Sequence, residues 1–163
     1  MNVKSPILVK WLPPSTYCSL NVDGVSKGNP GKCGGGGCIR DSRGNFICGF
    51  SFFYGTGNSI VAEARALHDG LKLALDRNIR ISVLFSDSAT LIRAIAAGRY
   101  PHWAVYPWWR GICGMLTILK PDLMHTFREV GSDFNSGVGF MVLGSEWEKE
   151  SKFRQTFQES KFR

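Results

Sequence analysis

The sequence predicts a mixed α/β protein in which helices pack on a five-stranded sheet. Three observations lead to this prediction. Residues 18–23 alternate between apolar and polar positions, as is typical of a strand, and two further strand-like segments, 33–40 and the apolar, aromatic 46–54, follow with turn residues between them. From Ile60 the apolar spacing changes to the three-to-four-residue period of a helix. Beyond that helix, short apolar runs and helical patterns alternate, which gives the order β-β-β-α-β-α-α-β.

The first three strands are expected to form an antiparallel meander. A lead-in over residues 1–16 contains Pro13 and Pro14 and is not interior helix. A strand begins at Tyr17 and ends at Asp23, and a loop is expected over residues 24–31. Residues 33–40 and 46–54 form the next two strands, joined by a hairpin turn over residues 41–45.

The second half of the domain is expected to alternate helices and strands. Residues 55–58 break the third strand, and the apolar residues between Ile60 and Leu75 recur at helical spacing. A short strand over residues 81–85 is followed by helices over 91–97 and 108–119 and by a last strand over 123–130. Residues 17–130 therefore form one domain, and residues 131–163 are a divergent tail, a frayed helix or a disordered segment.

Composition narrows the class of protein. The chain has 163 residues, of which 44% are hydrophobic, enough to bury a core. No apolar run approaches the roughly eighteen residues of a membrane-spanning helix, and residues 6–9 are too short an apolar patch for a secretory signal. Five cysteines without a CxxC pair predict free thiols in a reducing compartment. We expect an intracellular protein of the nucleus or cytoplasm, without a membrane partner.

The net charge is +7, and residues 131–163 contribute nothing to it because they hold five charges of each sign. The basic excess of the preceding part favours a polyanionic partner, and a solvated basic surface explains it equally well.

Three acids lie at strand ends or on an inward helix face, where a catalytic or metal-binding role is expected. Asp23 and Asp87 each close a predicted strand, and Glu63 lies in the predicted first turn of the long helix, on its inward stripe. If the two strands are neighbours, the three carboxylates converge, and such a cluster needs divalent cations such as Mg²⁺ or Mn²⁺. Taken singly, each acid has a plainer explanation: Asp23 shapes a turn, Asp87 caps a helix, and Glu63 favours a helix N-terminus.

The residues around these acids resemble the ribonuclease H family, most closely the retroelement-derived domains common in plants. The resemblance rests on Asp23-Gly24 with the later Gly28-Asn29-Pro30-Gly31, on residues 62–67 (AEARAL) and on residues 85–88 (FSDS). Four weaker matches follow the family's order: residues 11–14, 36–41, the helix at Trp108, and 127–130. The resemblance covers roughly residues 11–130.

The resemblance implies a ribonuclease H-like fold and Mg²⁺-dependent endonucleolytic hydrolysis of the RNA strand of RNA–DNA hybrids. Asp23, Glu63 and Asp87 would be the catalytic carboxylates and hold two Mg²⁺ or Mn²⁺ ions. The residues expected to contact the substrate lie in the first loop and beside the other two acids: Gly24, Ser26, Asn29, Gly31, Asn58, Ser59 and Ser88.

Two other groups of residues have competing interpretations. His125 has the chemistry of a general base, but its place inside the last predicted strand favours packing or simple exposure. Trp103, Trp108 and Trp109 have the rings to stack on bases, while their helical spacing favours a place in the core.

The sequence departs from the family pattern after Val130. Gly131, Phe134 and Asn135 stand where the family has Asn, Ala and a fourth metal-binding Asp, and no closing helix follows. Asp133 replaces that fourth carboxylate only if the alignment of this segment with the family pattern shifts by two residues. The alternative function is therefore a catalytically weak or inactive nucleic-acid-binding domain, and a protein-interaction module is a third. Protein partners are not predicted.

Overall fold

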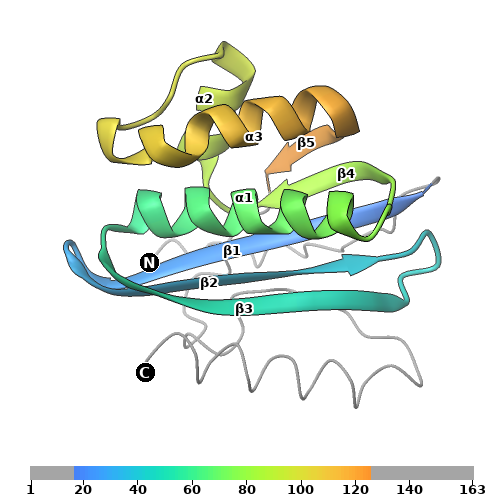
Figure 1. Cartoon of the computed structure of the whole chain (residues 1–163), viewed down its shortest axis with the longest axis horizontal. Helices are drawn as coiled ribbons and strands as arrows, with labels where there is room; N and C mark the ends of the chain where they lie inside the picture. The colour runs from blue at the N-terminus through green and yellow to red at the C-terminus, as the bar shows by residue number, and fades with distance from the viewer. Residues whose placement is uncertain (1–16, 126–163) are drawn as a thin grey trace, which may run out of the picture.

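A computed structural model describes residues 17–125 of the chain. The described part forms one five-stranded sheet with helices packed on it (Figure 1). The strands are β1 (Cys18–Gly28), β2 (Gly31–Arg40), β3 (Phe46–Gly57), β4 (Ile81–Ser86) and β5 (Asp122–His125). The helices are α1 (Ser59–Asp76), α2 (Ala89–Ala97), the 3₁₀ turn η1 (Trp103–Val105) and α3 (Tyr106–Leu119).

The sheet is mixed, with the order β3-β2-β1-β4-β5. β1, β2 and β3 pair antiparallel, while β4 pairs parallel with β1 and with β5. The predicted fold class and the antiparallel meander are thereby confirmed. β1 lies at the centre, where the antiparallel and parallel halves of the sheet meet.

The first two hairpins differ from the prediction. The expected loop over residues 24–31 is wrong, because β1 continues to Gly28 and only Asn29 and Pro30 form the turn to β2. β3 likewise continues to Gly57 instead of ending near residue 54. The glycines that suggested loops pair with each other instead: Gly24 lies opposite Gly35, and Gly31 opposite Gly57. Main-chain pairing between neighbouring strands overrides the weak strand propensity of glycine.

The prediction of a strand over residues 123–130 is met by β5 as far as His125. The lead-in over 1–16, the rest of that strand and the predicted tail over 131–163 lie outside the described residues.

The hydrophobic core lies between the sheet and α1, with α3 packed against α1. Leu20 of β1, Leu67 and Leu71 of α1 and Leu84 of β4 are fully buried in it. Trp109 and Ile112 of α3 join the same cluster, so the core interpretation is confirmed for Trp109. None of the described helices is long and apolar enough to span a membrane.

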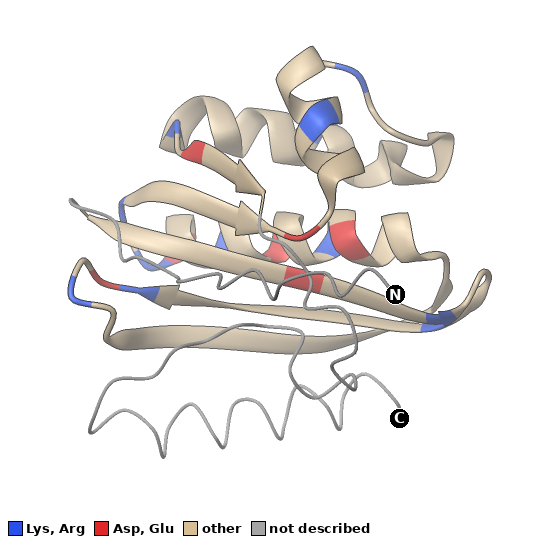
Figure 2. Cartoon of the chain, turned by 180° about the vertical axis from the view of Figure 1, so that it is seen from behind, with Lys and Arg blue, Asp and Glu red and all other residues tan. Residues whose placement is uncertain are grey.

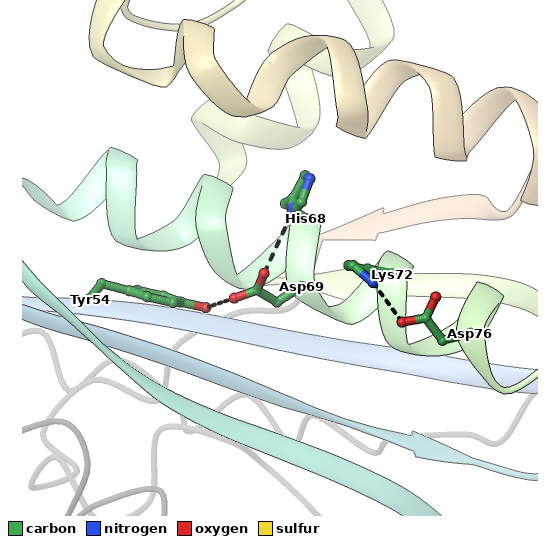
Figure 3. Close-up of polar contacts among 5 residues, drawn as sticks. All are labelled: Tyr54, His68, Asp69, Lys72 and Asp76. Carbon is green, nitrogen blue, oxygen red and sulfur yellow. Dashed lines mark hydrogen bonds and ion pairs between the residues drawn. The ribbon is translucent and has the colours of Figure 1, made fainter.

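Polar contacts attach α1 to its neighbours on both sides. The Tyr54 hydroxyl of β3 donates a hydrogen bond to Asp69 Oδ2 of α1 at 2.7 Å, and His68 Nδ1 lies 3.4 Å from Asp69 Oδ1 (Figure 3). Burial, and then the hydrogen bond to Asp69, raises the pKa of Tyr54. The Arg65 guanidinium lies 4.2 Å from the centre of the Tyr54 ring and 4.9 Å from that of the Trp108 ring of α3. The exposed Lys72–Asp76 pair in the same view adds little stability.

Gly35 of β2 sets how closely α1 approaches the sheet. A Cβ at this position would lie 2.6 Å from Cε2 of Tyr54 and 2.8 Å from Cβ of Ala66. Both distances are shorter than van der Waals contact, so a larger residue forces β3 and α1 apart.

Gly35→Ala should therefore lower the free energy of unfolding by about 1–3 kcal/mol, the usual cost of overpacking a core. Gly114→Ala is the matched control, because a Cβ there meets nothing within 4 Å. Since Gly114 lies inside α3, the control should be neutral or stabilising by about 0.5–1 kcal/mol. Urea denaturation followed by circular dichroism measures both. Equal effects of the two substitutions would contradict the packing argument.

Candidate functional site

Two of the three acids are placed by the parallel pairing of β1 with β4. Val22 of β1 lies opposite Ser86, the last residue of β4. The next residue in the chain is Asp23 after Val22 and Asp87 after Ser86. The two acids therefore lie close together, at the point where β4 ends beside β1. The prediction that Asp23 closes its strand is wrong, because β1 continues past it to Gly28. β4 ends at Ser86, one residue beyond the predicted strand, so Asp87 directly follows it, and the later part of β1 is left without that neighbour.

Glu63 is the third acid, and α1 carries it to the same place. The helix begins after Asn58, whose side chain accepts a hydrogen bond from Val61 N, so Glu63 is the fifth residue of α1. It lies in the second turn, not the first as predicted, because the N-cap is Asn58. Gly24 allows the helix to approach: a Cβ there would lie 2.3 Å from Ala62 C and from Glu63 N.

The three side chains form a compact acidic centre. One carboxylate oxygen from each of Asp23, Glu63 and Asp87 lies within 4.8 Å of the others. Figure 2, the view from behind, shows red segments close together on β1, on α1 and at the β4–α2 junction. Glu63 is only 7% exposed, so its charge is largely removed from water. Three hard oxygen donors at this spacing fit a Mg²⁺ or Mn²⁺ ion.

The plainer explanations for the acids do not match their surroundings. Ser88, not Asp87, is the N-cap of α2, since its hydroxyl accepts from Leu91 N at 3.2 Å. Asp23 is followed by strand instead of a turn, and Glu63 lies beyond the first turn of its helix. Capping and turn formation therefore account for none of the three.

Five residues predicted to contact the substrate gather where the β1–β2 turn meets the start of α1. The Asn29 side-chain oxygen accepts a hydrogen bond from Ser59 N at 3.0 Å, which fastens the turn to the helix. The Ser26 hydroxyl donates to Gly57 O at 2.8 Å and also contacts Gly28 O. Gly31 begins β2, and a Cβ there would lie 2.0 Å from Lys27 O.

The remaining two predicted substrate contacts, Gly24 and Ser88, lie beside the acids. Both have a structural task as well, because Gly24 packs under α1 and Ser88 caps α2. Contact of any of the seven residues with a substrate stays a prediction. Asp133 and Asn135, the positions considered for a fourth carboxylate, lie outside the described residues.

A groove of about 590 Å³ lies next to this junction. It is lined by Asn29, Asn58 and Ser59, by parts of β3 and α1, and by Trp103 of η1. Trp103 is 77% exposed, so the core interpretation is wrong for this tryptophan. Its position was missed because Trp103 lies in η1, before α3 begins, and not in the helix that holds Trp108 and Trp109.

His125 also lies at the site. It is exposed at the end of the described part of β5, and its Nε2 lies 3.1 Å from the Asp87 carbonyl oxygen. Because a carbonyl only accepts, Nε2 donates this hydrogen bond. The sequence analysis did not foresee this contact, because it depends on the parallel pairing of β5 with β4, which places His125 opposite Ser86.

A mixed sheet of this order, with acids on β1, on α1 and directly after β4, is the ribonuclease H-like fold. Its likeness to ribonuclease H1 of Halobacterium salinarum has a TM-score of 0.62 at 21% identity, over 68% of this chain and 86% of that one. The chain belongs to the reverse transcriptase-like family, whose model matches residues 21–106.

Two further relatives link the sequence to ribonucleases H. A protein of Arabidopsis thaliana with a provisional ribonuclease H name is 30% identical over 92 residues, which make up 56% of this chain and 15% of that protein. The chain thus spans under a sixth of that relative's length. LC11 ribonuclease H1, isolated from compost, was solved in complex with an RNA/DNA hybrid. It is 25% identical with a TM-score of 0.60, over 75% of this chain and 94% of that one.

Gly24→Ala should disturb the acidic centre without removing an acid. The added methyl group would meet the main chain of Ala62 and Glu63, so α1 must shift away from β1. We expect a loss of about 1–3 kcal/mol in the free energy of unfolding. We also expect weaker Mn²⁺ binding in calorimetric titrations of the folded variant.

The Gly114→Ala variant serves again as control and should bind Mn²⁺ as the unmodified chain does. If Gly24→Ala lowers stability and leaves Mn²⁺ affinity unchanged, Gly24 does not position Glu63.

Proposed function

We propose that this chain hydrolyses the RNA strand of RNA–DNA hybrids with Mg²⁺ or Mn²⁺. The observation that carries the proposal is the convergence of Asp23, Glu63 and Asp87. One carboxylate oxygen of each lies within 4.8 Å of the others, at the point where β4 ends beside β1. Membership of the reverse transcriptase-like family and the relatives named as ribonucleases H support it.

In this proposal the three carboxylates hold and orient divalent ions, two in the full site. When bound, such ions activate a water for attack on the phosphodiester and stabilise the leaving 3′-oxygen. The protein's own contribution is to fix the acids in advance: β1 and β4 place Asp23 and Asp87, and α1 places Glu63. The low exposure of Glu63 keeps that carboxylate away from competing water.

The substrate would lie over the junction of the β1–β2 turn with α1. Asn29 and Asn58 use their side-chain oxygens within the protein, which leaves their amide N–H groups as donors for phosphate or 2′-hydroxyl oxygens. The neighbouring glycines let a sugar-phosphate chain approach the main chain closely. Contact with 2′-hydroxyls would distinguish RNA from DNA, and binding should weaken as salt rises.

A second candidate is a nucleic-acid-binding domain with little or no catalytic activity. The observation that favours it is Asn135, an amide where the resemblance to ribonucleases H calls for a fourth carboxylate. An amide is a weaker ligand for a hard divalent ion than a carboxylate, so a second ion would bind less tightly.

Cleavage of a labelled RNA–DNA hybrid by the 163-residue chain tests the first candidate. We expect cleavage with Mg²⁺ or Mn²⁺ and none with chelator. Asp23→Asn should lower the rate by about a hundredfold or more, since several kcal/mol of charge stabilisation depend on the metal ligands.

Asp76→Asn makes the same chemical change at an exposed acid of α1 and should leave the rate unchanged. Salt-dependent binding of the hybrid without metal-dependent cleavage would select the second candidate. Neither binding nor cleavage by folded protein would contradict both.

A further inference from the structure

β3 is the last strand on one side of the described sheet, so its outer main-chain edge faces away from β2 (Figure 1). The strand is twelve residues long, and its sequence FICGFSFFYGTG contains no acidic or basic residue and no proline. A long, uncharged edge strand is a template on which another strand can pair.

The side chains of this edge are unusually apolar for an exposed position. Ile47, Phe52 and Phe53 are 44%, 50% and 46% exposed, respectively. The opposite edge of the described sheet is less suited to pairing. β5 begins with Asp122 and follows Lys120 and Pro121, which are residues that discourage edge pairing. The β3 edge is therefore the better suited of the two described edges to accept a strand.

The pairing of β3 with β2 defines the segment that is available. Residues Cys48 to Phe53 pair with β2 in six consecutive steps, and the register shifts on either side, at Ile47 and at Tyr54. These irregularities interrupt the edge, because a bulge bends a strand and strengthens its twist. Regular pairing with a further strand is confined to the six residues between them.

We propose that two copies of this chain form a dimer by antiparallel pairing of their Cys48–Phe53 segments about a two-fold axis. Antiparallel pairing of identical strands is self-complementary, so each copy presents the same surface to the other. Neither segment carries a charge, so pairing opposes no like charges and buries none. The Phe50 and Phe52 rings, 5.7 Å apart within one copy, extend into one aromatic layer across the junction.

The proposed pairing leaves no free β3 edge for a third copy. It occupies the β3 edge of both copies, and Asp122 at the start of β5 discourages a second junction at the other described edge, which favours a dimer over a fibre. The acidic centre is on β1, β4 and α1, and β2 separates β1 from β3. The dimer therefore leaves both acidic centres accessible and is independent of the proposed activity.

Light scattering after size exclusion, over a range of concentrations, tests the proposal with the full chain. The expected result is a species of twice 18.1 kDa at high concentration that dissociates on dilution. Hydrogen exchange should show slower exchange of amides in residues 48–53 at high concentration than at low concentration.

Phe53→Lys places a charge on the edge and should shift the chain to monomer with unchanged circular dichroism. Ile118→Lys makes the same type of change at an exposed apolar residue of α3 and should leave the dimer intact. A monomer at every concentration would overturn the proposal. So would aggregates without a dimer, or an equal response to the two substitutions.

Discussion

Mutual repulsion among Asp23, Glu63 and Asp87 is the constraint around which the rest of the domain is arranged. At separations near 5 Å, two carboxylates repel by about 3 kcal/mol for an effective dielectric constant of about 20. Parallel pairing of β1 with β4, the fit of α1 over Gly24 and the Ser88 cap of α2 hold the acids together against this repulsion. A divalent cation bound between them would offset the repulsion. The geometry of the acidic centre therefore depends on the stability of the whole sheet.

Close packing of α1 on the sheet is what makes this arrangement possible. Gly24 and Gly35 lie under the helix where any side chain would collide with it, and Gly70 of α1 faces Leu20 and Val22 in the same way. The Tyr54–Asp69 hydrogen bond and the Arg65 contacts hold the helix from the β3 and α3 sides. Glycine weakens a strand or helix taken alone, and here it permits the approach on which the position of Glu63 depends.

The sequence predicted the fold class and the three acids because hydrophobic period and local motifs are properties of neighbouring residues. It failed where contact with another element decides the structure. Residues 24–28 are strand because residues 31–35 of β2 pair with them, and β3 is prolonged because its residues 55–57 pair with residues 31–33 of β2. The Asn29–Ser59 hydrogen bond joins residues thirty apart, so no local pattern indicates it. Trp103 and Trp109 look alike in sequence, yet only Trp109 is buried, because Trp103 lies in η1 while Trp109 lies in α3, which packs against the core.

Calorimetric titration of Mn²⁺ into the folded chain decides whether these acids form a divalent-metal centre. We expect saturable binding that is abolished or strongly weakened by each of Asp23→Asn, Glu63→Gln and Asp87→Asn. The exposed Asp76→Asn substitution should leave it intact. Binding that survives all three substitutions at the acidic centre, or no binding by the folded, unmodified chain, would contradict the account.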